Sequence, residues 1–537
     1  MKKLLLPALA AAVLFCVLAL PNHPDALGWS VLRHIPLELP VLLLLMLAVG
    51  NKWRLASVLA LVLVAVTFLK LADMGMYLAY DRSFNPVLDT FLIKAGIGLL
   101  GDSIGRPLTY VALVAAVLGI LTLFYILLRS LQLWGRVRIS RFGRVLALVG
   151  AVGFGGWTVA DAGHHLGFWS LKVIPGGAAR TSQMAVKRGM DVQTTMADLV
   201  QFKRDAQQNI YAGATGLLGR LQGHDVIVIY IESYGRASFD NPLYAPTHKA
   251  TLATAEGVLR QEGFAVRSGW LTSPTAGGQS WLAHGTLASG LWTTDQGRYT
   301  AMLASGKKSL FHIAQEAGFR TSAFMPAITM PWPESSAMGF DQVFPAAAIP
   351  YKGDRFNWVT MPDQFTLAAY SDLLADDPRP DFIQIALISS HAPWVPVPDM
   401  VPWDEVGDGT IFNEMAARGP TPRELWKNRD DVREAYRRAI DYSLQVTFEH
   451  VARLGDDAPL VAIVGDHQPA GFVAGSDNRD VPVHLVGPPA IIAHIDQWGW
   501  GDGLIPSSTA PVRRMDRFRD AFVSAFSEPV RLTEVQK

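Results

Sequence analysis

The sequence predicts a multi-pass α-helical membrane domain followed by an α/β domain with a largely parallel central sheet. Three observations predict this architecture. Half of the 537 residues are apolar, and the long apolar runs lie near the start of the chain. After residue 223, buried-strand patterns alternate with helical patterns. Three of these strands end in polar side chains, as expected where a parallel sheet builds a site beyond its carboxyl edge.

Five apolar runs are long enough to cross a membrane, although two of them need flanking residues to do so. They cover residues 4–20, 36–50, 55–71, 108–128 and 145–162. Together they define a predicted transmembrane domain over residues 1–165. A cleaved signal peptide is the alternative for the first run, because Lys2 and Lys3 precede it. No clear small-x-small cleavage site follows that run, however, and further spans come after it.

Basic residues orient the predicted spans. They precede the first span and lie between the second and third and between the fourth and fifth, as Lys2, Lys3, Lys52, Arg54, Arg129, Arg136, Arg138, Arg141 and Arg144. By the positive-inside rule these segments are cytoplasmic. An odd number of spans then leaves the rest of the chain on the other side. The predicted location is the cytoplasmic (inner) membrane, with an extracytoplasmic or periplasmic C-terminal domain.

Two segments follow the membrane domain. Residues 166–222 form an amphipathic linker with a predicted helix over Ser182–Gln208, which either lies on anionic lipid or packs on the next domain. Residues 223–530 form the predicted extracytoplasmic domain, with helical patterns over Thr247–Gln261, Ser309–Ala317, Pro362–Leu374 and Asp430–Leu454. The single cysteine, Cys16, lies in the first span, so this domain has no disulfide. The zero net charge argues against nucleic acid as a partner. The oligomeric state stays open.

Three predicted strands deliver polar groups to one edge of the sheet. The strands and the groups that follow them are 225–231 with Glu232, 381–388 with His391, and 459–464 with Asp466 and His467. Carboxylates and imidazoles are metal-ligand types. The carboxyl ends of parallel strands meet at the same edge, so the pattern predicts one site.

A glycine-rich segment supplies a candidate hydroxyl. Residues 277–290 have the pattern of a loop that turns into a short helix at Ser280. A hydroxyl at a helix N-terminus lies at the positive end of the helix dipole, where backbone N–H groups can hold an anion. From the local sequence alone, a serine that only caps the helix is the more frequent case. His484, in the strand-like segment 481–486, is more often a packing residue than a ligand.

The ordered motifs resemble the alkaline phosphatase and sulfatase superfamily. The five spans ahead of such a domain resemble, more narrowly, the lipoteichoic acid synthase and phosphoglycerol transferase branch. The resemblance covers about residues 225–488 and the membrane layout. Its motifs are Ile-Glu-Ser-Tyr at 231–234, Gly-Phe-Asp-Gln-Val-Phe at 339–344, Trp358 with Asp363, His-Ala-Pro-Trp at 391–394 and Gly-Asp-His-Gln-Pro at 465–469. It implies an alkaline-phosphatase-like (sulfatase-like) α/β fold.

The resemblance also implies a metal-dependent transferase that moves a phosphoglycerol-type head group from a membrane phospholipid to an extracytoplasmic glycan or lipid. Ser280 is the implied nucleophile, because it opens a helix that ends at Ser289-Gly290. His391 is the implied acid, base or phosphate-binding residue, and its alternative role is to order the Ala-Pro-Trp turn. One divalent ion is implied, with Mn²⁺ favoured and Zn²⁺ or Mg²⁺ as alternatives. Its implied ligands are Glu232, Ser280, Asp466 and His467.

Departures from the family pattern leave the substrate open. Leu282 and His284 stand where sulfatases have the Pro and Arg that follow a formylglycine nucleophile, which argues against a formylglycine sulfatase. Glu334 stands where the branch has an arginine that helps hold glycerol phosphate. An acid there would repel a phosphate and instead pair with an ammonium or a sugar hydroxyl. The predicted substrate-binding residues are His391, Trp332, Glu334 and Trp358, although Trp332 is as readily a core residue.

Three alternative functions remain. A phosphoethanolamine transferase shares the five-span layout and a Ser or Thr nucleophile, although such enzymes usually carry disulfides in the exported domain. A phosphodiesterase or phosphatase would pass the intermediate to water instead of an acceptor. A non-enzymatic binding module would have lost a ligand, whereas all four implied ligands are present here.

Overall fold

The computed structural model describes residues 2–28, 35–80, 83–171, 177–329, 332–374, 376–455 and 458–528. Two compact units make up the chain, residues 1–200 and residues 201–537. The first is helical, and the second contains all the strands that the described residues form.

Three helices of the first unit are long and apolar enough to cross a membrane: Trp53–Leu78, Arg106–Gly135 and Arg141–His165. The other two predicted spans form the shorter apolar helices Leu5–Ala19 and Glu38–Val49. A helix rises about 1.5 Å per residue, so these two alone fall short of a hydrocarbon core about 30 Å thick. The helices of this unit are α1 (Lys2–Ala19), α2 (Glu38–Val49), α3 (Trp53–Tyr80), α4 (Thr90–Ile104), α5 (Arg106–Gly135), α6 (Arg141–His165) and α7 (Arg180–Ala206).

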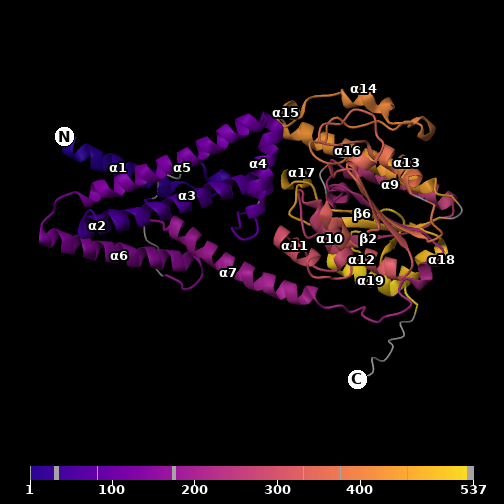
Figure 1. Ribbon diagram of the computed structural model, residues 1–537, viewed down its shortest axis with the longest axis horizontal. Coiled ribbons are helices and arrows are strands. Elements are labelled where there is room, and N and C mark those ends of the chain that lie inside the picture. The colour runs from indigo at the N-terminus through magenta and orange to yellow at the C-terminus, as the bar shows by residue number, and fades with distance from the viewer. Residues whose placement is uncertain are drawn as a thin grey trace, which may run out of the picture. The chain divides into compact units, whose positions relative to one another are not determined.

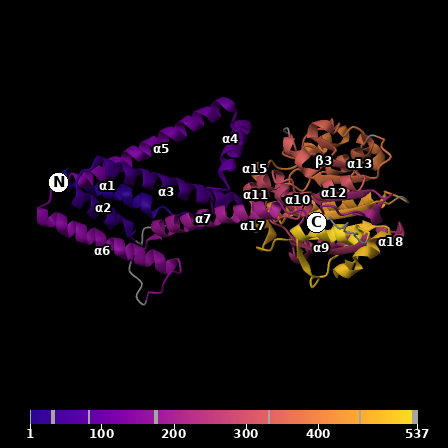
Figure 2. The same cartoon turned by 60° about the horizontal axis from the view of Figure 1, so that its bottom comes forward.

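The apolar helices pack against one another without the second unit. α2 and α6 lie side by side in both views (Figure 1, Figure 2). Leu14 of α1, Met46 of α2 and Leu127 of α5 belong to one buried apolar cluster, and each is fully shielded from solvent. α4 lies between the third and fourth predicted spans, where no helix was predicted. Ile93, Ile97 and other apolar residues of α4 recur at helical spacing and are exposed, as in an interfacial helix.

The start of α7 is anchored on the other helices of the first unit. Asp161 of α6 accepts hydrogen bonds from the backbone N–H of Ala179 and from the side chain of Gln183. The buried guanidinium of Arg188 donates hydrogen bonds to both carboxylate oxygens of Asp73, Oδ1 at 2.8 Å and Oδ2 at 2.9 Å. Acidic groups thus hold the N-terminal end of α7, where the helix dipole is positive.

The second unit is built on one nine-stranded sheet. Its order is β4-β3-β5-β1-β6-β7-β2-β8, and β9 pairs with β2 outside this order. From β4 to β6 every neighbouring pair is parallel. The strands are β1 (Val226–Ile231), β2 (Ala265–Thr272), β3 (Arg320–Met325), β4 (Gln342–Pro345), β5 (Asp381–Leu387), β6 (Leu460–Gly465), β7 (Asp480–Gly487), β8 (Gly501–Asp502) and β9 (Val512–Arg514).

The prediction of a largely parallel sheet is corrected at β7. This strand pairs antiparallel with both β6 and β2, so the sheet is mixed. The connection from β6 to β7, residues 466–479, contains only the four-residue helix α17 (Gly471–Ala474). The chain therefore re-enters the sheet from the edge at which β6 ends. A parallel pairing would need a crossover to the opposite edge, usually by a full helix.

Helices cover both faces of the sheet (Figure 1). Ile229 of β1 shares an apolar core with side chains of α9, α13 and α16. On the opposite face, the Phe382 ring of β5 lies 5.6 Å from Phe311 of α12 and 6.2 Å from Phe522 of α19. The helices are α8 (Ala237–Asp240), α9 (Ala245–Gln261), α10 (Ser280–Ser289), α11 (Gln296–Leu303), α12 (Leu310–Glu316), α13 (Asp363–Leu373), α14 (Asn413–Ala416), α15 (Pro422–Leu425), α16 (Arg429–Ala452), α17 (Gly471–Ala474), α18 (Pro489–Ile492) and α19 (Phe518–Phe526).

Candidate metal and nucleophile site

Two neighbouring parallel strands bring the metal-binding side chains together. β1 ends at Ile231 and β6 at Gly465, and these residues are partners in the register of the sheet. Glu232 follows the first, and Asp466 and His467 follow the second. Strands that run in the same direction release their following residues at the same edge, so the three side chains emerge side by side.

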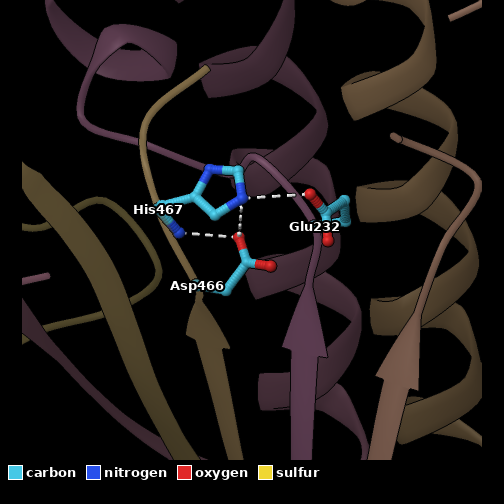
Figure 3. Close-up of side chains that lie close together, drawn as sticks. All are labelled: Glu232, Asp466 and His467. Atoms are coloured by element: carbon cyan, nitrogen blue, oxygen red, sulfur yellow. Dashed lines mark hydrogen bonds and ion pairs between the residues drawn. The ribbon is translucent and has the colours of Figure 1, made fainter. Parts of the chain in front are cut away.

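The three side chains converge on one point (Figure 3). His467 Nε2 lies 3.1 Å from Glu232 Oε1 and 3.9 Å from Asp466 Oδ1. One potential ligand atom from each residue lies within 4.8 Å of the others. Glu232 is 7% exposed, and the other two are 1% exposed. Two buried carboxylates and an imidazole make a donor set suited to a divalent metal ion.

Backbone groups orient these side chains. His467 Nδ1 lies 2.8 Å from the Gln468 carbonyl oxygen, which places the proton on Nδ1 and turns the Nε2 lone pair toward the carboxylates. Asp466 Oδ1 accepts hydrogen bonds from the backbone N–H of Ser233 at 2.8 Å and of His467 at 2.6 Å. The carboxylate is therefore fixed before any ion arrives.

Burial sets the electrostatics of the cluster. Burial and the neighbouring Glu232 carboxylate raise the pKa of Asp466 well above its ordinary value. Burial lowers the pKa of His467, but Asp466 and Glu232 outweigh burial and raise it to about 9. Burial likewise raises the pKa of Glu232, yet the charge and hydrogen bond of His467 bring it below its ordinary value. Without metal, the raised pKa values of Asp466 and His467 both favour a bound proton, which lowers the negative charge of the buried cluster.

These residues fit a divalent cation in charge and in chemistry. The two ionised carboxylates carry two negative charges, which one divalent cation balances in place of the two protons. Oxygen and imidazole donors suit Mn²⁺, Zn²⁺ or Mg²⁺ and do not by themselves choose among them.

Ser280 completes the cluster. Its Oγ donates a hydrogen bond to Glu232 Oε2 over 2.7 Å and lies 3.2 Å from His467 Nε2. Ser280 is the first residue of α10, as its sequence context predicts. The preceding Gln279 has a left-handed φ of 65°, and this turn directs the helix N-terminus at the cluster. The positive end of the helix dipole favours negative charge beside Ser280 Oγ.

Close backbone packing holds together the two loops that carry the metal-binding side chains, one after β1 and one after β6. Gly465 lies against the carbonyl group of Tyr234, and a side chain there would overlap its oxygen. Gly235 lies equally close to the Gln468 side chain, whose Oε1 accepts a hydrogen bond from the backbone N–H of Ala237 at 3.1 Å. Only glycine leaves room at these two positions.

A loop behind Glu232 carries His391. Ser390 Oγ donates to the Glu232 carbonyl oxygen over 2.6 Å, which ties the loop to the cluster. His391 itself is exposed, and its Nδ1 lies 2.5 Å from the Ala392 carbonyl oxygen. That hydrogen bond leaves Nε2 available to a substrate. His391 therefore neighbours the metal-binding group without belonging to it.

Asp363 holds this loop in place. It is fully buried, and its Oδ1 accepts hydrogen bonds from the backbone N–H of Ile388 and Ser389, both at 2.8 Å. Its Oδ2 accepts from Ser443 Oγ at 2.7 Å. The residue stands at the start of α13, so one carboxylate links that helix, α16 and the end of β5.

The other predicted substrate-binding residues are not brought into the cluster. Trp332 is half-buried, and its ring lies 6.3 Å from that of Phe340. Trp358 is 61% exposed. The side chain of Glu334 lies outside the described residues. No contact within the described part of the chain joins either tryptophan to the three metal-binding side chains.

His484 and His284 are among the other buried histidines of the same unit. His484 lies in the core, with Nδ1 2.7 Å from Ser268 Oγ and Nε2 3.2 Å from the Tyr234 hydroxyl, in agreement with a packing role. His284 stacks on Tyr230 at a ring distance of 3.9 Å. Burial lowers the pKa of His284 to about 4, so this side chain is neutral.

Three residues that support the cluster were named from the sequence only as members of family motifs, and no role was predicted for them. The backbone N–H of Ser233 donates a hydrogen bond to Asp466, and the Gln468 carbonyl oxygen accepts one from His467 Nδ1. Asp363 accepts a hydrogen bond from the loop that carries His391. Ser233 and Gln468 directly follow predicted ligands, so adjacency was the available signal. Asp363 carried no such signal, because its partners lie in distant segments.

Comparisons with known proteins agree with this fold. Residues 225–485, which include all four clustered residues, match the Sulfatase family model. The lipoteichoic acid synthase LtaP from Listeria monocytogenes is 12% identical, with 61% of this chain and 78% of that chain covered and a TM-score of 0.35. The Streptococcus pyogenes phosphoglycerol transferase GacH, solved with sn-glycerol-1-phosphate, is 13% identical, with 62% and 82% covered and a TM-score of 0.38.

A third solved structure is the C-terminal periplasmic domain of the phosphoethanolamine transferase EptC from Campylobacter jejuni. It is 11% identical, with 57% of this chain and 90% of that chain covered and a TM-score of 0.34. A search of curated proteins finds no match. The family match over residues 225–485 confirms, for this segment of the chain, the resemblance to sulfatases that the sequence motifs indicated.

Proposed function

We propose that the chain is a membrane-bound, metal-dependent transferase. It moves a phosphoglycerol-type head group from a phospholipid to an extracytoplasmic glycan or lipid, as in the lipoteichoic acid synthase and phosphoglycerol transferase branch. One observation carries the proposal. Ser280 Oγ stands at a helix N-terminus, 2.7 Å from Glu232 Oε2 and 3.2 Å from His467 Nε2. A serine in that position has the surroundings of a nucleophile rather than of a simple helix cap.

The proposed metal ligands are Glu232, Ser280, Asp466 and His467. When bound, a divalent ion supplies positive charge and Lewis acidity to the phosphate oxygens. Mn²⁺ is the favoured ion, with Zn²⁺ and Mg²⁺ as alternatives. The N-terminus of α10 adds a favourable field for the phosphate anion beside Ser280.

In the first half-reaction, Ser280 Oγ attacks the lipid phosphorus. Its proton leaves along the hydrogen bond to Glu232 Oε2. The bond between phosphorus and the diacylglycerol oxygen breaks, and His391 gives a proton to that oxygen. A phosphodiester on Ser280 results, and free diacylglycerol departs.

In the second half-reaction, an acceptor hydroxyl attacks the same phosphorus. His391 takes the proton of that hydroxyl, the bond from phosphorus to Ser280 Oγ breaks, and the serine regains a proton. The exposure of His391 supports this role, because a bulky glycan can approach it. Trp332, Glu334 and Trp358 are the proposed contacts to head group and acceptor.

The membrane arrangement belongs to the same proposal. Five spans with basic residues at their cytoplasmic ends place the catalytic domain outside the inner membrane. Three long apolar helices support it, and the two shorter ones, α1 and α2, complete the proposed count with their flanking residues. Phospholipid donors and glycan acceptors are both available on that side.

Trapping the intermediate tests the proposal. The purified full chain is incubated with Mn²⁺ and phosphatidylglycerol labelled in the head group, quenched in acid, digested and analysed by mass spectrometry. We expect a glycerophosphate adduct on the peptide that contains Ser280. Ser280→Ala abolishes the adduct and turnover, while Ser371→Ala, at an exposed serine of the same unit, retains both.

The products separate transfer from hydrolysis. Label that appears in an added glycan or lipid acceptor supports transfer, and label released only as free glycerol phosphate supports a phosphodiesterase. Steady turnover by Ser280→Ala would remove Ser280 from the nucleophile role. An adduct of different mass would identify another head group, including phosphoethanolamine.

A further inference from the structure

A small cavity in the helical unit joins charged and apolar side chains. Its volume is about 90 Å³, and it lies among the end of α1, the start of α2, α3 and the start of α7. Its charged lining residues are Glu38, Lys70 and Arg180. Leu18, Leu20 and Met184 are among its apolar lining residues. Charged groups between apolar helices are expensive and therefore mark a binding function more often than they fill a core.

The hydrogen bonds of Lys70 leave its charge unbalanced. Lys70 is 3% exposed, and its Nζ donates to the Leu18 carbonyl at 2.8 Å, the Val17 carbonyl at 3.3 Å and Thr181 Oγ1 at 2.9 Å. These three acceptors are neutral oxygens. They fix the position of the ammonium group but supply no counter-charge, and the single carboxylate of the lining, Glu38, faces two cations, Lys70 and Arg180, so one positive charge remains unbalanced. An anion in the adjoining cavity would balance it.

Two other groups in the cavity lining have free binding capacity. Glu38 Oε1 accepts a hydrogen bond from the backbone N–H of Ser182 at 2.8 Å, whereas its buried Oε2 has no partner among the described residues. Arg180 is exposed, and within the described ranges its guanidinium has no hydrogen-bond or ion-pair partner. The cavity therefore offers donors for an anion and one buried acceptor for an O–H or N–H group.

We propose that this cavity binds the head group of a phospholipid whose phosphate is followed by a hydroxyl or ammonium group. The phosphate lies between Arg180 and Lys70, and the distal O–H or N–H donates to Glu38 Oε2. The apolar lining carries the glycerol end of the lipid. A volume of about 90 Å³ equals about three water molecules, enough for part of a head group while the acyl chains remain outside.

The site deepens the proposed function, because it assigns a place for the donor lipid or for a lipid that stabilises the membrane unit. In the proposed orientation, the end of α1 and the start of α2 lie at the outer surface of the membrane, where head groups are found. The occupant is a lipid rather than a soluble phosphate, because the cavity adjoins apolar helix surface. Exposed residues of that surface include Phe68 and Leu71, which lie close to Lys70 on α3.

Lipid binding is measured on the purified full chain carrying Ser280→Ala, so that no lipid is consumed. Short-chain phosphatidylglycerol, phosphatidylethanolamine and phosphatidylcholine are titrated separately, with binding read by native mass spectrometry and thermal shift. We expect Arg180→Gln to weaken phosphatidylglycerol binding about tenfold, the value of one charge-assisted hydrogen bond. The matched control Lys187→Gln, at an exposed residue of the same helix outside the cavity, changes it less than about twofold.

Glu38→Gln tests the acceptor without removing the Oε1 hydrogen bond to Ser182. We expect it to weaken the binding of phosphatidylglycerol and phosphatidylethanolamine but not that of phosphatidylcholine, whose quaternary ammonium has no N–H donor. Equal affinities of Arg180→Gln and Lys187→Gln would overturn the site. Inorganic phosphate that binds as tightly as the lipid would overturn the lipid assignment. If the protein with the native Ser280 binds the lipid in this cavity but shows no turnover, the lipid site is supported and the proposed function is not.

Discussion

Gly465→Ala is the most direct test of how the sheet builds the site. An alanine Cβ would lie 2.9 Å from the Tyr234 carbonyl carbon and closer still to its oxygen. Nonbonded carbons rest about 3.5–4.0 Å apart, and the contact with the oxygen is closer still, so the end of β6 and the Glu232–Tyr234 segment must separate by at least about 1 Å. Reactive groups tolerate about 0.5 Å, and a misplacement of about 1 Å reduces turnover about 100-fold.

The same substitution lowers stability. Overpacking of this kind costs about 1–3 kcal/mol, which thermal unfolding of the full chain detects by tryptophan fluorescence. Mn²⁺ titration calorimetry on the same samples measures the loss of metal affinity, for which we expect about 10–100-fold.

Gly257→Ala is the matched control. Gly257 lies in α9, and a Cβ there meets nothing within 4 Å. We expect this variant to gain about 0.5–1 kcal/mol of stability and to keep its metal affinity. If Gly465→Ala binds metal and turns over like the parent protein, the close approach of the two ligand loops is not what positions the site.

Three further predictions follow from single observations. Glu232→Gln removes one negative charge from the cluster, so we expect the Mn²⁺ affinity measured by calorimetry to fall at least about 100-fold. The circular dichroism spectrum should stay unchanged. An unaltered Mn²⁺ affinity would exclude Glu232 as a ligand. Asp363→Asn keeps the Oδ1 acceptor of the Ile388 and Ser389 N–H groups but turns Oδ2, the acceptor of the Ser443 Oγ hydrogen bond, into an NH2 donor. Thermal unfolding should show a loss of about 1–3 kcal/mol, against no change for exposed Asp404→Asn. Burial lowers the pKa of His484 to about 3, below its ordinary 6.5. Between these two pH values the unfolded chain binds a proton at this residue and the folded chain does not. The free energy of unfolding therefore decreases as the pH falls from about 6.5 toward 3. At pH 5 this loss is about 2 kcal/mol, and a stability difference between parent and His484→Gln that does not shrink on acidification would contradict it.

Much of the second unit was predictable because its strands are buried on both faces. The apolar runs before Glu232, His391 and Asp466 predicted β1, β5 and β6 with ends correct to within two residues. The register of β1 with β6 then follows from the polar groups that end them, since both must reach the same edge. The lengths of these apolar runs and the polar residues that follow them predicted this part of the site.

The direction of β7 was not predictable from its pattern. Residues 481–486 are equally apolar whether the strand runs parallel or antiparallel to β6, because both faces are covered. What decides the direction is the connection over residues 466–479, which lacks a crossover helix. Short polar connections of this kind carry little periodic signal.

The role of Asp363 shows a second limit. Its carboxylate is buried by contacts with the end of β5 and with Ser443, eighty positions along the chain. Nothing adjacent to residue 363 reveals those partners. Ser280 was assigned by family resemblance, and the contact between its Oγ and Glu232 spans 48 positions. Such pairings arise from tertiary structure, and local sequence patterns do not contain them.

The left-handed backbone at two positions beside the cluster makes stability and activity conflicting requirements. Ser233 has a φ of 59° and Gln279 a φ of 65°, in a region where residues with side chains lose about 1 kcal/mol or more. Glycine at either position would relieve that strain and loosen the turn that aims Asp466 or Ser280. Selection for a more heat-resistant protein would therefore favour these two positions first, and the resulting variants would gain stability at the expense of turnover.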